Sequence, residues 1–218
     1  MSARCRLCQA ALVAAAVLLL PACTFNAPSR EAPALYGLGE HAGHAGQRHS
    51  IPGTLLIPPV GSPAWLETTG IMYRLNYDDP QRLRAYTSSR WVASPAMLLT
   101  EELRSRFAGR AERVVSGTDG AQADSVLRVE LEEYTQSFDV PEHSRVTLRA
   151  RATLVDRKSR DIVGQRTFRV EREAAPNAAG AAATLAECSA QFIENLLDWV
   201  AENLKNSGAA STAQRSAR

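Results

Sequence analysis

The chain of 218 residues has 45% hydrophobic and 22% charged residues, and its formal net charge at pH 7 is +2. This composition is typical of a globular protein and excludes a collagen-like or wholly disordered chain. The first 22 residues contain two arginines and no acidic residue, so the remaining chain has as many basic as acidic residues. Such a balance gives no electrostatic reason to expect a nucleic acid as a partner.

Residues 1–22 have the pattern of a secretory signal peptide. Arg4 and Arg6 precede an unbroken apolar run, residues 10–20, which is too short to cross a bilayer as a helix. The run leads into Leu20-Pro21-Ala22-Cys23, which resembles the processing box of bacterial lipoproteins. We therefore expect cleavage before Cys23 and a covalent lipid on its thiol. The alternative is a plain signal peptide followed by an incidental cysteine.

Lipidation of Cys23 predicts how the protein is held at a membrane. Acyl chains contribute ~0.8 kcal/mol per buried CH₂, so several of them hold a protein on a membrane without a spanning helix. Thr24 follows the cysteine where inner-membrane lipoproteins carry aspartate. By the bacterial sorting rule this resembles a destination at the outer membrane, on its periplasmic face. Apart from this lipid, the sequence predicts no cofactor.

The other cysteines predict no intramolecular disulfide. Cys5 and Cys8 leave with the signal peptide, so Cys188 is the only thiol expected to remain beside the lipidated Cys23. Cys188 lies on the apolar side of a predicted helix. We interpret it as a small buried hydrophobic residue, with an intermolecular bridge as the alternative.

Composition divides the mature chain into three parts. Residues 23–50, which begin with the lipidated cysteine, are rich in glycine and proline and are predicted to form a flexible tether. Residues 51–205 are long enough for one domain with its own core. Residues 206–218 are small and polar and are predicted to be a disordered tail.

Three histidines in the tether, His41, His44 and His49, are the candidate metal ligands of the sequence. Two imidazoles at this spacing could meet one ion, but Glu40 is the only carboxylate that the segment offers. A structural zinc site needs four ligands. We therefore favour a solvated loop and predict no metal site.

Strands are predicted where apolar and polar residues alternate. The alternation is strictest in the middle of the domain, where Leu127, Val129 and Leu131 are separated by charged residues. Three such runs joined by polar turns predict an antiparallel meander with one buried and one solvated face. The predicted strands, in chain order, are residues 54–58, 71–75, 83–87, 126–138, 145–156 and 162–172.

Two amphipathic helices complete the predicted fold. The first begins at Ser94-Pro95, an N-cap followed by proline, and ends at Gly109; the second spans about residues 182–204. Each has a single apolar stripe, which is typical of a helix that lies on a sheet. The sequence therefore predicts an α/β (α+β) two-layer sandwich, a mostly antiparallel sheet of about six strands with two helices on one face.

Charged residues of the meander are predicted to form ion pairs rather than an active site. The sequence has no glycine-rich phosphate loop, no Gly-x-Ser-x-Gly elbow and no histidine pair at helical spacing. Acidic residues of one strand are expected to face arginines of the next across a solvated sheet face, where such pairs are common. These residues are Glu130, Glu132 and Glu133, opposite Arg145, Arg149 and Arg151. We therefore predict a protein that is not an enzyme.

Residues 71–99 contain several tyrosine and tryptophan residues beside arginines. The core would account for one or two of these aromatic residues. Aromatic residues beside arginine are also typical of protein contact surfaces. Both interpretations stay open, and the candidate residues for partner contact are Tyr73, Arg74, Tyr86, Arg90 and Trp91.

The same residues carry a family resemblance. Ile71-Met72-Tyr73-Arg74, then Tyr86, then the segment from Arg90-Trp91 to Pro95, and earlier Leu35-Tyr36-Gly37-Leu38, follow one another in this order. This order is similar to that of the ABC-type transport auxiliary lipoprotein family, the PqiC-like proteins. In that family a Tyr-x-Leu segment comes first. It is followed by an aliphatic-Tyr-Arg step, a tyrosine and a Trp-x-x-x-Pro helix entry. The resemblance extends over about residues 35–204.

This resemblance implies a non-enzymatic part of an envelope transport system. Members of the family are encoded with an ABC transporter and an MCE-domain protein that moves lipids between the two membranes. The implied partners are therefore a periplasmic MCE-domain protein with its ABC transporter, the outer membrane through the acyl anchor, and a second copy of the chain. The alternatives are a structural lipoprotein for outer-membrane assembly or cell-wall attachment, and a periplasmic hydrolase or metal-binding protein.

Overall fold

The computed structural model describes residues 32–39, 51–117 and 120–216, with side chains up to residue 208. The signal peptide, Cys23 and the three histidines of the predicted tether lie outside the described residues. From Pro33 onward the chain forms one unit. Its elements are β1 (Ala34–Tyr36), β2 (Ile51–Leu56), η1 (Ala64–Leu66), β3 (Gly70–Leu75), β4 (Asp79–Trp91), α2 (Pro95–Ala108), β5 (Ala111–Val115), β6 (Ser125–Val140), β7 (His143–Asp156), β8 (Ile162–Ala174) and α3 (Ala178–Ser216).

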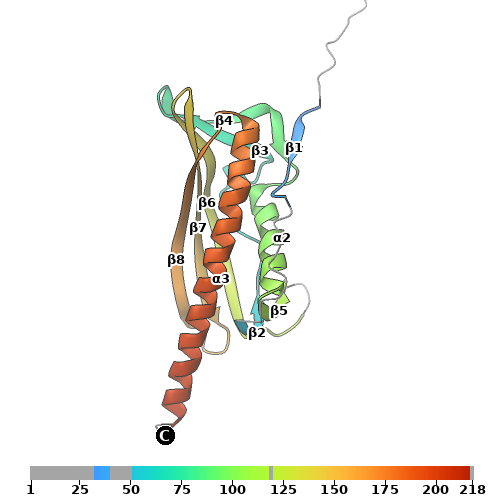
Figure 1. Cartoon of the computed structure of the whole chain (residues 1–218). Helices are drawn as coiled ribbons and strands as arrows, with labels where there is room; N and C mark the ends of the chain where they lie inside the picture. Colours follow the sequence, from blue (N-terminus) through green and yellow to red (C-terminus); the bar gives the residue numbers. More distant parts are fainter. Residues whose placement is uncertain (1–31, 40–50, 118–119, 217–218) are drawn as a thin grey trace, which may run out of the picture. The chain divides into compact units, whose positions relative to one another are not determined.

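In the described part of the chain, eight strands form one sheet, and α2 and α3 lie on one face of it (Figure 1). This confirms the predicted α+β architecture. The sheet is mixed. In addition to the antiparallel hairpins it has parallel pairs: β1 with β4, β2 with β5, β2 with β6, and β3 with β6. The prediction of about six strands missed β1 and β5, and it extended the antiparallel pattern of the meander to the whole sheet.

Strand β6 is the centre of the sheet. Along one edge it pairs with β7 from Ser125 to Val140. Its other edge is shared, since β2 pairs with its first residues and β3 pairs with Gln136, Ser137 and Phe138 near its end. Strand β6 is long enough for β2 and β3 to pair with different parts of the same edge. Between these two parts, the chain that connects β2 to β3 makes one isolated bridge, from Gly61 to Glu130.

The core lies between the meander β6–β7–β8 and α3. Leu127 pairs with Leu154 and Leu148 with Val170, and all four side chains are buried on the same face. Burial of each side chain of this kind stabilises the folded state by roughly 1.5–3 kcal/mol. On α3, the apolar stripe that the sequence indicates is buried against these strands: Leu185, Cys188, Phe192, Leu196 and Val200.

Both helices begin at recognisable signals. Pro95 occupies the first turn of α2 after Ser94, as predicted, and Gly109 follows its end. In α3 the side chain of Asn177 accepts a hydrogen bond from the Gly180 amide at 2.8 Å, which is the contact of an N-cap residue. The helix therefore starts four residues before the predicted position.

Helix α3 continues to Ser216, into the predicted tail. The sequence predicts the end of this helix near residue 204 because the apolar stripe ends there. Residues beyond it include several alanines, which have the highest intrinsic helix propensity. Helix can therefore continue past the last residue that packs on the sheet.

The predicted tether is too long at its C-terminal side. Residues 34–36 form β1, which pairs in parallel with residues 89–91 of β4, and Leu38 is buried. A three-residue strand that pairs with a distant segment leaves no alternation in the sequence. The folded unit therefore begins near residue 33 rather than at residue 51.

A glycine sets the approach of α3 to the sheet edge. A Cβ atom at Gly164 of β8 would lie 2.7 Å from Asn203 Oδ1 and 3.0 Å from the Trp199 ring. We expect Gly164→Ala to lower the free energy of unfolding by about 1–3 kcal/mol, because the Asn203 amide and the Trp199 ring must shift from their packed positions. Gly61→Ala is the matched control, since its Cβ would meet only ordinary contacts. Urea unfolding of both variants gives the comparison, and equal midpoints would contradict this close approach.

Candidate functional site

The five residues predicted to contact a partner do not share one surface. Trp91 is 1% exposed, and its ring packs against Tyr134 with 5.6 Å between centroids. The Tyr134 hydroxyl in turn lies 3.0 Å from Ser189 Oγ on α3. Trp91 therefore belongs to the core under the helices, and its assignment to a contact surface is wrong.

Tyr73 and Tyr86 form a half-buried aromatic cluster on the same side of the sheet as the helices. Tyr73 pairs with Gln136, which lies two residues after Tyr134 and so on its face. The Tyr73 ring centroid is 4.6 Å from that of Tyr86 and 6.0 Å from that of Phe138. The two tyrosines extend the core beyond the start of α3.

The hydroxyl of Tyr86 satisfies a fully buried glutamine. It donates to Gln136 Oε1 at 2.7 Å, while Gln136 Nε2 donates to Ser144 Oγ at 2.7 Å and to the Ala175 carbonyl at 2.9 Å. Burial, with the neighbouring Tyr73, raises the pKa of Tyr86 to about 12, so the hydroxyl keeps its proton and remains a donor at neutral pH. The contacts give Tyr86 a structural role.

We expect Tyr86→Phe to lower the free energy of unfolding by about 1–2 kcal/mol, because it leaves the buried Gln136 oxygen without a donor. Tyr77→Phe is the control, since Tyr77 is 48% exposed in the turn after β3. The control should change stability by no more than about 0.5 kcal/mol. Chemical denaturation measures both, and an unchanged Tyr86→Phe protein would show that the hydrogen bond contributes nothing.

Arg74 and Arg90 lie on the opposite, outer face of the sheet, away from the helices. Arg74 alternates with Tyr73, and Arg90 with the buried Trp91. The register joins the two arginines on one face, because Arg90 pairs with Gly70 and with Leu35 of β1. Of the five predicted contact residues, Arg74 and Arg90 are the two that lie on the outer face of the sheet.

Apolar side chains surround the two arginines. Leu35, opposite Arg90, is 62% exposed, and Leu83 lies opposite Arg74. The guanidinium of Arg74 is 6.0 Å from the ring centroid of Trp65 in η1, at the limit of a cation–π contact. We call this set the outer basic surface: Leu35, Trp65, Met72, Arg74, Leu83 and Arg90.

Trp65 is the member of the outer basic surface with the weakest signal in the sequence. It lies in Pro63-Ala64-Trp65-Leu66, between two predicted strands and outside every periodic pattern. Leu66 of the same turn is fully buried, which fixes the 3-10 turn and turns Trp65 outward over the sheet. A tryptophan in a loop with no periodicity is itself the signal that could have identified it.

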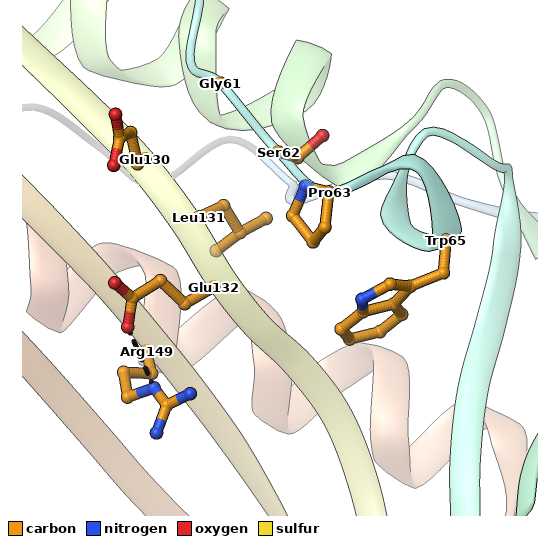
Figure 2. Close-up of a pocket in the computed structure, with 8 residues that line it drawn as sticks. All are labelled: Gly61, Ser62, Pro63, Trp65, Glu130, Leu131, Glu132 and Arg149. Atoms are coloured by element: carbon orange, nitrogen blue, oxygen red, sulfur yellow. Dashed lines mark ion pairs between the residues drawn. The ribbon is translucent and has the colours of Figure 1, made fainter.

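A pocket of about 680 Å³ opens beside the outer basic surface, in the interval where β6 has neither β2 nor β3 along its edge (Figure 2). Its apolar lining comes from Pro63, Trp65 and Leu131. Its charged rim consists of Glu130, Glu132 and Arg149, and Arg149 Nε lies 3.0 Å from Glu132 Oε2. A β-bulge at residue 132 places Glu132 and Glu133 opposite the single residue Arg149, which brings both carboxylates to the outer face.

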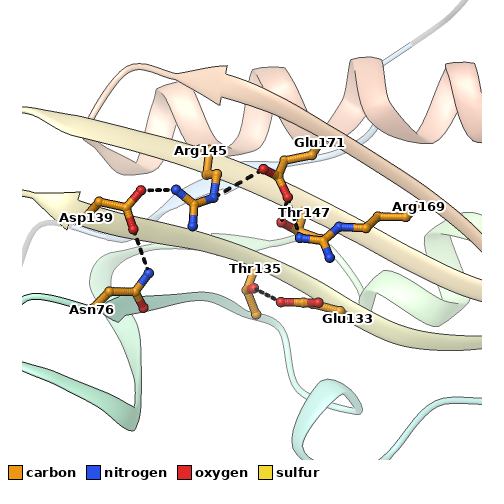
Figure 3. A network of polar contacts seen from close by, with 8 residues as sticks. All are labelled: Asn76, Glu133, Thr135, Asp139, Arg145, Thr147, Arg169 and Glu171. Carbon is orange, nitrogen blue, oxygen red and sulfur yellow. Dashed lines mark hydrogen bonds and ion pairs between the residues drawn. The ribbon is translucent and has the colours of Figure 1, made fainter.

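The rest of the outer face is a network of ion pairs across β6, β7 and β8 (Figure 3). Arg145 pairs with Asp139 and, at 3.3 Å, with Glu171, whose other oxygen accepts from Arg169 at 2.6 Å. The hydrogen bond from Arg169 lowers the pKa of Glu171. The predicted cross-strand pairing is confirmed for Arg149 with Glu132 and for Arg151 with Glu130, whereas Arg145 pairs with Asp139 and Glu171. Exposed pairs of this kind contribute about 0.2–1 kcal/mol each, and they neutralise both partners.

Groups suited to other chemistry are few in the described residues. No cluster of three or more His, Cys, Asp or Glu side chains is placed there to hold a metal ion. Cys188 is buried, as predicted, and burial raises the pKa of its thiol to about 11, which makes it a poor nucleophile at neutral pH. None of the described helices is long and apolar enough to cross a membrane.

Comparison with known proteins identifies the family of the chain. The model of the ABC-type transport auxiliary lipoprotein component family matches residues 36–196. Because this match covers most of the chain, the chain belongs to that family. The family is a class of transport accessory proteins and not a class of enzymes.

Solved structures share the fold. A Xanthomonas campestris protein of the DUF330 family superimposes with a TM-score of 0.71 at 17% identity, over 80% of this chain and 98% of its own. An uncharacterised protein gives a TM-score of 0.59 at 17% identity, over 78% of this chain and 99% of its own. At this identity the two structures support the fold alone. A comparison with curated proteins found no match.

Proposed function

We propose that the protein is a lipid-anchored auxiliary component of an ABC/MCE-type system that moves lipids or related hydrophobic compounds between the inner and outer membranes. The observation that carries this proposal is the family match over residues 36–196. Lipid on Cys23 holds the chain on the periplasmic face of the outer membrane, with Thr24 as the sorting signal. The partner is a periplasmic MCE-domain protein together with its ABC transporter.

The outer face of the sheet supports a binding role in this system. The opposite face is covered by α2 and α3, while the outer basic surface and the neighbouring pocket are open to solvent (Figures 1 and 2). The ionisable residues of the outer face that the structure describes are mostly engaged in ion pairs, as in the network of Figure 3. In this proposal the domain works by binding: it holds the periplasmic end of the transport system at the outer membrane.

Crosslinking in intact cells tests this function. The lipidated protein is crosslinked, extracted from membranes and purified, and bound proteins and lipids are identified by mass spectrometry. We expect an MCE-domain protein to be enriched relative to an unrelated outer-membrane lipoprotein treated in the same way. Recovery of cell-wall or β-barrel assembly components with no MCE-domain protein would contradict the proposal and favour the structural alternative.

A further inference from the structure

The outer face of the sheet has two halves of different charge character. Across β6, β7 and β8, arginines and carboxylates neutralise each other, as in the pairs of Arg149 with Glu132 and Arg151 with Glu130. By contrast, β1, β3 and residues 83–91 of β4 contain no Asp or Glu. The outer basic surface lies on this second half, so Arg74 and Arg90 have no carboxylate in the strand segments that carry the surface.

Among the residues that the structure describes, neither Arg74 nor Arg90 has an acidic partner. Arg74 donates only to the Pro80 carbonyl at 3.4 Å and lies over Trp65. Arg90 is exposed, and its side chain makes no hydrogen bond or ion pair with any residue that the structure describes. Two guanidinium groups that present free donors beside an exposed Leu35 combine charge with apolar area, as the contact residues of protein interfaces do.

We propose that the outer basic surface binds an acidic, partly apolar segment of a partner protein, with one apolar side chain of that segment in the pocket beside Trp65. Carboxylates of the segment pair with Arg74 and Arg90, each of which can donate two parallel hydrogen bonds to one carboxylate. This inference rests on the proposed function only for the identity of the partner. The proposed surface differs from the one predicted from the sequence. It leaves out Tyr73, Tyr86 and Trp91, which belong to the core, and it includes Leu35 and Trp65.

The shape of the surface favours a protein segment over a phospholipid. A site for acyl chains has to enclose most of their surface in apolar walls. The strands β1, β3 and β4 instead present an open sheet face, and the pocket next to them is rimmed by Glu130, Glu132 and Arg149. Such a site suits an extended segment whose side chains alternate between the surface and solvent.

Charge reversal tests the surface. The probe is the purified periplasmic domain of the MCE-domain protein encoded with this chain, and its affinity for the full-length lipidated protein in detergent is measured at several salt concentrations. We expect Arg74→Glu and Arg90→Glu each to weaken binding about tenfold, with a smaller salt dependence than the unchanged protein. Arg128→Glu is the matched control, because Arg128 is exposed on the ion-paired half. It should change affinity less than about twofold.

The outcomes separate this inference from the proposed function. Binding that is unaffected by both reversals, while urea unfolding midpoints are unchanged, overturns the surface and leaves the function intact. Absence of binding by the unchanged protein counts against the proposed function. The surface is then tested in cells with a photoreactive amino acid at Leu35, and at Thr167 on the outer face of β8 as control.

Mass spectrometry of the crosslinked peptide decides this second test. An adduct at Leu35, absent at Thr167, with a peptide that contains Asp or Glu beside apolar residues supports the proposal. An adduct with phospholipid, with a peptide that lacks acidic residues, or at the same level as the Thr167 control overturns it.

Discussion

Replacing Trp91 by alanine should lower the free energy of unfolding by about 3–5 kcal/mol, the usual range for a buried tryptophan or phenylalanine. The side chain is 1% exposed and packs against Tyr134, which in turn contacts α3. Its loss leaves a cavity between the end of β4 and the helix. The total free energy of unfolding of a domain of this size is only about 5–15 kcal/mol, so the variant should be largely unfolded at elevated temperature.

Arg90→Ala is the matched control, one residue earlier on the same strand. Its side chain is exposed and has no partner among the described residues, so stability should change by less than about 0.5 kcal/mol. Urea unfolding followed by circular dichroism measures both proteins. A Trp91→Ala protein with full stability and reduced partner binding would reverse the assignment and restore Trp91 to a contact surface.

The second large effect is expected at the anchor. If Cys23 is lipidated as proposed, Cys23→Ala removes the acceptor thiol and with it the acyl chains, which together hold the protein on a membrane at ~0.8 kcal/mol per buried CH₂. We expect the protein to move from the membrane fraction to the supernatant after cell lysis and to lose incorporation of labelled palmitate.

Cys188→Ala controls for loss of a cysteine as such. Its thiol is buried in the core and should not accept lipid, so this variant should stay in the membrane fraction. A Cys23→Ala protein that still sediments with membranes and still incorporates palmitate would contradict the lipoprotein interpretation of Leu20-Pro21-Ala22-Cys23.

Local periodicity accounts for the parts of the fold that could be predicted. The strands at 126–138, 145–156 and 162–172 agree closely with β6, β7 and β8, because each alternates apolar and polar residues on one buried face. Strands β1 and β5 are short and pair in parallel with distant segments. A parallel pairing depends on contacts far apart in the sequence, so neither strand leaves a local pattern of its own.

The candidate site was harder to predict because composition does not distinguish the two faces of a strand. Tyr73 and Arg74 are neighbours, as are Arg90 and Trp91, yet each pair is divided between the helix side and the outer face. Between them the β3–β4 register shifts, since Gly70 pairs with Arg90 and Met72 with Ala85. Only the observed register shows which residues share a face.

If the chain is anchored through a lipid on Cys23, as proposed, incorporation of β1 into the sheet limits how far the domain can stand from the membrane. If the flexible chain ran from Cys23 to residue 51, the domain could extend about 100 Å from the lipid. With Ala34 already paired to β4, the free segment spans at most about 40 Å. On that proposal the domain stays beside the bilayer surface, and a transport apparatus that crosses the periplasm would have to bring its own end to that surface.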